Sequence, residues 1–137
     1  YVLGTIFVFV SGYLSDKSGR RAIWAAVAMI GAASGIYIGA HTPDNLTAAL
    51  AISIGFGMIG MGLPVCWALL QQFVPARAVA TGAGLMNGLS QACGAAAPVL
   101  IGYFISLTGG YMGGLMFLVA VGVVSACCGI ILAFHKY

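Results

Sequence analysis

Three side chains within otherwise apolar stretches are candidates for binding a solute: Trp67, Asn87 and Gln91. Asn87 and Gln91 are four residues apart, so they share one face of a helix. An amide buried in lipid without a partner is costly, so both are expected to face a bundle interior or a cavity, where they could hydrogen-bond a polar solute. The alternatives are interhelical hydrogen bonds for the two amides and an interfacial position for Trp67.

Acid–base and metal chemistry have no candidates in the same stretches. The apolar runs contain no Asp, Glu, Lys, Arg or His, so they offer no proton donor or acceptor for catalysis. Four cysteines lack metal-ligand spacing and are predicted to be small packing residues: Cys66, Cys93, Cys127 and Cys128. The sequence therefore predicts no enzyme activity, no metal site and no cofactor.

The composition indicates which solvent surrounds the chain. Of its 137 residues, 62% are hydrophobic and 5% are charged, whereas a soluble domain carries about 25% charged residues. So few charges cannot cover a soluble surface, and we expect the lipid bilayer to surround packed helices. The 21 glycines agree, because small residues let membrane helices approach closely. The net charge of +3 gives no indication of nucleic-acid binding.

Polar segments divide residues 1–137 into five apolar stretches that we expect to be helices. The first, at residues 1–14, would be ~21 Å long, which is short of the ~30 Å needed to span a bilayer. It is interpreted as part of a truncated helix, so that the chain is a fragment. The remaining spans are expected at residues 22–40, 46–73, 79–107 and 115–134. Together they predict an all-α integral membrane protein.

The basic residues all fall on one side of the predicted membrane. Segments 15–21, 74–78 and 135–137 must share a side, and they hold all five Lys and Arg residues. Segments 41–45 and 108–114 lie on the other side and hold none. The positive-inside rule then places the first group, including the C-terminus, in the cytoplasm.

Glycine spacing adds two kinds of expectation. Close helix packing is predicted where glycines recur every four residues, at Gly31, Gly35 and Gly39 and at Gly84 and Gly88. A candidate hinge or cavity wall is predicted at Gly60, Gly62 and Pro64, because Gly and Pro together weaken a helix at mid-membrane depth.

Residues 12–21 read GYLSDKSGRR and combine a carboxylate with a basic cluster at a membrane boundary. Gly12 would let a neighbouring helix approach closely, and Gly19 permits a tight turn. Asp16 is favourable beside a helix N-terminus or an Arg. A plain positive-inside loop with a capping Asp is the alternative. The segment resembles the characteristic loop of the major facilitator superfamily, G-x-L-[AS]-D-[RK]-x-G-R-[RK], and matches every fixed position.

This resemblance implies a transporter that works by alternating access between two six-helix bundles. The aspartate of the loop would hold the two halves together on the cytoplasmic side in the outward-open state. The gating residues carried over by the motif are Gly12, Asp16, Lys17, Gly19, Arg20 and Arg21.

The family carries this loop twice, after its second and its eighth helix. The first-half copy should be followed by an Arg near the start of the second helix downstream, which here begins at Leu46 without one. Residues 98–103 (PVLIGY) and 108–111 (TGGY) resemble the eleventh helix and the following turn. The resemblance thus implies a partial helix eight plus helices nine to twelve of a twelve-helix fold, with helices two to six as the alternative. The N-terminal half would be the missing partner.

A narrower resemblance rests on residues 64–69 (PVCWAL), 74–75 (VP) and 81–87 (TGAGLMN). They are similar to the anion:cation symporter family, which implies proton-coupled uptake of an organic anion, such as a sugar acid or other carboxylate, across a bacterial inner membrane. Trp67 and Asn87 occupy positions where that family often places residues near the substrate. The alternatives are efflux of a drug or other solute, and a non-transporting membrane scaffold or subunit.

Overall fold

The computed structural model describes residues 2–134. This part of the chain folds into five α-helices without strands: α1 (Val2–Ser18), α2 (Arg21–His41), α3 (Asn45–Phe73), α4 (Val79–Thr108) and α5 (Tyr111–Phe134). A 3-10 turn, Ala76–Ala78, precedes α4. The last four helices are long and apolar enough to cross a membrane, as the sequence predicts, and the fold is that of an all-α membrane protein.

The helices extend beyond the apolar stretches from which they were predicted. The expected loop at 15–21 is reduced to a turn at Gly19 and Arg20, because α1 continues to Ser18. Polar residues at a membrane boundary still form backbone hydrogen bonds within the helix, so hydropathy underestimates its length. Gly19 has φ 65°, a left-handed conformation that glycine adopts without steric cost. The turn before α5 is also shorter than predicted, and Gly109 has φ 70°.

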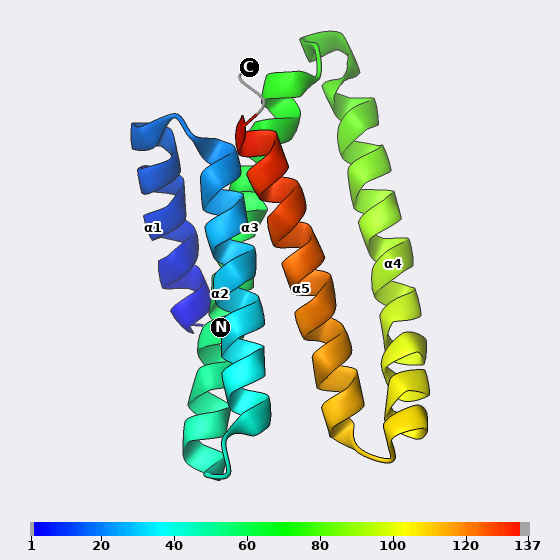
Figure 1. Ribbon diagram of the computed structural model, residues 1–137. Coiled ribbons are helices and arrows are strands. Elements are labelled where there is room, and N and C mark those ends of the chain that lie inside the picture. The colour runs from blue at the N-terminus through cyan, green and yellow to red at the C-terminus, as the bar shows by residue number, and fades with distance from the viewer. Residues whose placement is uncertain (1, 135–137) are drawn as a thin grey trace.

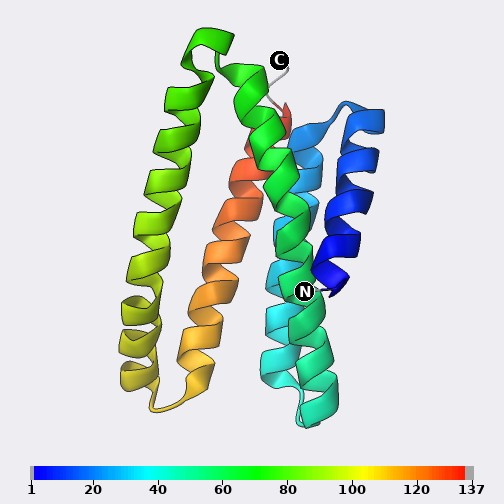
Figure 2. The same cartoon turned by 180° about the vertical axis from the view of Figure 1, so that it is seen from behind.

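Figures 1 and 2 show α4 on the outer side of α5, away from α1 and α2. α2 lies at the centre and packs against α3 and α5, while α1 packs mainly against α3. α4 contacts mostly α5 and touches α3 only weakly. None of the residues of α4 is buried, whereas α2 supplies eight buried residues.

The connections alternate between the two ends of the bundle, as the predicted spans require. The α1–α2 turn, the α3–α4 connection and the C-terminal end of α5 lie at one end, which we call the basic end (Figure 1). The α2–α3 and α4–α5 turns lie at the other end. Lys17, Arg20, Arg21 and Arg77 belong to the basic end, and Lys136 falls outside the described residues.

The glycine stripe of α2 forms a close contact with α3. A Cβ atom at Gly35 would lie 2.7 Å from the carbonyl oxygen of Ala51 and 2.7 Å from the Cα of Gly55. Real Cβ atoms do not approach backbone this closely, so only glycine fits. The predicted packing at Gly31, Gly35 and Gly39 is confirmed, since a Cβ at each would meet α3.

The second glycine pair behaves differently. A Cβ at Gly84 or Gly88 would meet nothing within 4 Å among the described residues, so the predicted packing is not found there. The spacing makes one face of α4 smooth, but none of the described helices covers that face. The four cysteines are also exposed, so their predicted role as packing residues is wrong for this part of the chain.

The candidate hinge lies within a continuous helix. α3 runs unbroken through Pro64, although proline has no N–H to donate to the carbonyl of Gly60. A Cβ at Gly60 would lie 3.3 Å from the Gly4 carbonyl oxygen, and one at Gly62 would lie 3.1 Å from Cε of Met29. In this conformation the two glycines admit α1 and α2 to α3, and the hinge stays a prediction.

Candidate functional site

One arginine joins three helices at the basic end. Arg21, the first residue of α2, places Nη2 3.4 Å from Oδ1 of Asp16, near the end of α1. Its Nη1 donates a hydrogen bond to the carbonyl oxygen of Ala68 on α3, at 3.2 Å. This is the one ion pair among residues 2–134. It unites Asp16 and Arg21 of the predicted gating motif, and it adds a contact with α3 that the motif does not reveal.

The pair is weak enough to open without unfolding the bundle. The Asp16 side chain is 73% exposed and that of Arg21 is 32% exposed. Exposed ion pairs contribute at most ~1 kcal/mol, because water screens the charges and both side chains lose conformational entropy. The contact therefore adds little to stability, and a modest change in surroundings can break it.

Hydrogen bonds around the α1–α2 turn hold the two arginines in place. The Gly19 N–H donates to the carbonyl oxygen of Ser15 at 3.0 Å, which closes the end of α1. The indole Nε1 of Trp24 donates to Oγ of Ser18 at 2.8 Å, so the first turn of α2 is tied back to α1. Sequence reasoning missed this role of Trp24, because an aromatic residue near a helix end is equally typical of the membrane interface.

Three other residues of the loop, Lys17, Gly12 and Ser15, take no part in the ion pair. Lys17 places its ammonium group 5.9 Å from the centre of the Tyr13 ring, within cation–π range. The predicted close approach at Gly12 is not found, since a Cβ there would meet nothing within 4 Å. Ser15 is 3% exposed, and its Oγ has no hydrogen-bond partner among the described residues.

The predicted substrate residues are not enclosed by this part of the chain. Asn87 and Gln91 are exposed on α4, and Trp67 on α3 is 38% exposed. None of the three lines the cavity at the start of α2 or the one between Ser34 and Val123. The two amides thus do not face an interior formed by residues 2–134, and their role in binding a substrate stays a prediction.

Comparison with known proteins confirms the resemblance to membrane transporters. No family model and no solved structure matches the chain. It is 33% identical over 112 residues to a "Putative metabolite transport protein" of Haemophilus influenzae, covering 79% of this chain and 25% of the relative. It is 29% identical over 119 residues to a "Putative tartrate transporter" of Agrobacterium vitis, covering 87% and 26%. A second Agrobacterium vitis relative of the same name is also 29% identical. The chain spans about a quarter of the length of these curated relatives.

Proposed function

We propose that the chain is part of the second half of a major facilitator transporter, comprising part of helix eight and helices nine to twelve. The observation that carries this proposal is the Arg21 contact, which links Asp16 of the GYLSDKSGRR loop to the α3 backbone at a membrane boundary. The similarity to metabolite and tartrate transporters supports the same assignment.

In this proposal the basic end is cytoplasmic, and the Asp16–Arg21 pair is part of a gate. Transport by alternating access requires two arrangements of the helices that differ little in free energy. An ion pair worth at most ~1 kcal/mol can form in one arrangement and break in the other. Gly60, Gly62 and Pro64 would allow α3 to bend between the two, because the Gly60 carbonyl has lost its donor within the helix.

The proposed substrate is an organic anion carrying a carboxylate, taken up with protons. Asn87, Gln91 and Trp67 would form one wall of its path, with the two amides donating hydrogen bonds to carboxylate oxygens. Away from their ends, the described helices contain no Asp, Glu, Lys, Arg or His. The groups that carry protons and pair with the substrate charge would therefore belong to the N-terminal half of the transporter.

An uptake assay on the full-length transporter in proteoliposomes tests this function. We expect a radiolabelled dicarboxylate or sugar acid to accumulate when the interior is alkaline, and the accumulation to collapse when a protonophore removes the proton gradient. Export of a cationic dye without uptake of any organic acid would instead support the efflux alternative. Absence of all transport would support a scaffold or subunit role.

A further inference from the structure

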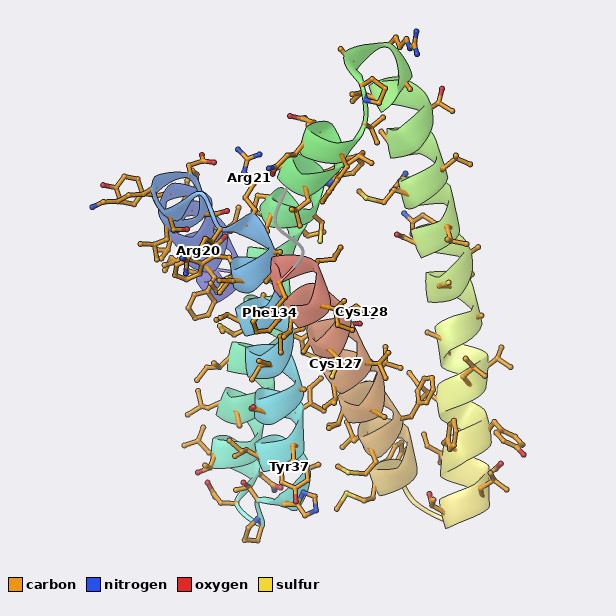
Figure 3. All side chains as sticks on the ribbon, turned by 45° about the horizontal axis from the view of Figure 1, so that its top comes forward. Arg20, Arg21, Tyr37, Cys127, Cys128 and Phe134 are labelled. Atoms are coloured by element: carbon orange, nitrogen blue, oxygen red, sulfur yellow. The ribbon has the colours of Figure 1, made fainter. Side chains whose placement is uncertain are left out.

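A cavity lies at the basic end, between the start of α2 and the ends of α3 and α5. Its volume is about 680 Å³, within the ~300–1,000 Å³ typical of ligand pockets. Arg20, Arg21 and Gln72 line it at the membrane boundary. Figure 3 shows Arg20, Arg21 and Phe134 at this same end of the bundle. Trp67, Asn87 and Gln91 do not line it, so it is distinct from the proposed substrate path.

The polar part of the cavity carries positive charge that the described residues do not fully neutralise. Arg21 is paired with Asp16, but Asp16 is the one acidic residue near it and takes part in the only ion pair among residues 2–134. The exposed Arg20 therefore has no acidic partner in the described structure. The N-terminal end of α2 also lies here without a side-chain cap, and its dipole adds to the attraction for an anion.

The rest of the cavity is apolar and faces outward. Val27 and Ile30 of α2 and Ile130 of α5 form its walls, and these side chains are 39%, 47% and 40% exposed. All three lie inside their helices, whereas Arg21 is the first residue of α2 and Arg20 precedes it. The cavity thus places cationic groups at the membrane boundary and hydrocarbon at acyl-chain depth.

We propose that this cavity binds one anionic phospholipid from the leaflet at the basic end. The phosphate lies beside Arg20 and Arg21, and an acyl chain lies against Val27, Ile30 and Ile130. Basic pockets between transmembrane helices recognise acidic headgroups in this way. A water-soluble anion would use only the arginines and leave the apolar walls exposed. Because Arg21 also pairs with Asp16, the bound phosphate competes with Asp16 for that guanidinium. The site does not depend on the proposed transport function.

Native mass spectrometry of the purified, delipidated full-length protein tests the proposal, with phosphatidylglycerol and phosphatidylethanolamine as probes. We expect preferential retention of one phosphatidylglycerol. Arg20→Gln should lower its affinity about fivefold, as expected for one charge near the membrane surface. Arg77→Gln, which removes an exposed charge at the same end but outside the cavity, should have no such effect.

A second pair of variants tests the apolar walls. Ile130→Trp fills the cavity and should abolish retention, whereas Val124→Trp on the exposed face of the same helix, outside the cavity, should not. Val27→Trp fills the cavity from α2, and it provides the same test if Ile130→Trp does not fold. Equal retention of the two lipids overturns the proposal, as does retention unchanged by both Arg20→Gln and a folded cavity-filling variant. Displacement of the lipid by inorganic phosphate alone would show a free-anion site and also overturn it.

Discussion

The α2–α3 interface and the Gly84–Gly88 face of α4 carry the same glycine spacing but have opposite surroundings. At Gly35 the two helices are so close that a Cβ would lie 2.7 Å from backbone atoms of α3. At Gly84 and Gly88 a Cβ would meet no described atom within 4 Å. Regular glycine spacing produces a smooth helix face in both cases, and the element across from it determines whether that face packs helix to helix.

The difference assigns the two regions different roles in the proposed transporter. α1, α2, α3 and α5 pack against one another and include every residue that the structure buries. α4 presents Asn87, Gln91, Gly84 and Gly88 on surface that this group leaves open. An open face with amides is suited to a solute path or to the other half of the protein, whereas the glycine interface holds the packed helices together.

The largest effect is expected from Gly35→Ala, which should destabilise the full-length protein by ~1–3 kcal/mol, because α2 and α3 must separate to admit the methyl group. The matched variant Gly88→Ala should change stability by less than ~0.5 kcal/mol, since its Cβ meets open space. Thermal unfolding followed by fluorescence-detected gel filtration measures both. A loss at Gly88→Ala as large as that at Gly35→Ala would mean that the α4 face is also closely packed.

Asp16→Asn should affect transport rather than folding. It removes a pair worth at most ~1 kcal/mol, which alters the balance between two conformations by about fivefold. We expect uptake by the full-length protein to fall by about this factor with expression unchanged. Asp44→Asn makes the same change at the opposite end, where the residue caps α3, and should leave uptake intact. Equal uptake by wild type and Asp16→Asn would remove the pair from the gate.

A smaller effect is expected at Ser15, whose hydroxyl is buried and has no hydrogen-bond partner among the described residues. Ser15→Ala removes an unsatisfied polar group, so stability should stay constant or rise by up to ~1 kcal/mol. Ser11→Ala is the matched control, because the buried Ser11 hydroxyl donates to the carbonyl oxygen of Val8 at 3.0 Å. Destabilisation by Ser15→Ala, measured by thermal unfolding, would show that the hydroxyl has a partner elsewhere in the full-length protein.

The smallest effect concerns the α3 cap. The Thr47 hydroxyl and backbone N–H both donate to the Asp44 carboxylate, which lowers its pKa below the ordinary value of 3.8. A lowered folded-state pKa means that the stabilisation is present above the ordinary pKa and is lost as pH falls through the lowered value. In the wild-type protein this loss should lower the unfolding temperature at acidic pH. Asp44→Asn retains a capping residue that does not titrate, so the unfolding temperature of this variant should lack that decrease. An identical decrease in both proteins would assign it to other groups.

The helices of this molecule follow directly from hydropathy, but their contacts do not. The apolar runs and the alternation of charge located α2 to α5, since a membrane helix must satisfy its backbone internally. The extension of α1 to Ser18 was missed because hydropathy does not register a helix that continues through polar residues. The open surroundings of Gly88 could not be read from its spacing, which is the same as that of Gly35.

The GYLSDKSGRR loop was predictable as a motif, and its structure was only partly so. Asp16 and Arg21 were both singled out, and the structure brings them together. The contact of Arg21 with the Ala68 carbonyl was not predicted, because no side chain identifies a backbone acceptor 47 residues away in sequence. The residues expected to bind substrate remain predictions, since Asn87, Gln91 and Trp67 are exposed in the described structure.

Thiol accessibility at position 87 tests most directly whether α4 lines a solute path. In the full-length protein with Cys66, Cys93, Cys127 and Cys128 replaced, Asn87→Cys should react with a membrane-impermeant reagent. A transported organic anion should slow that reaction, whereas Val124→Cys on the exposed face of α5 should not react. An unreactive Asn87→Cys, or one that no transported anion protects, would contradict the assignment of α4 to the substrate path.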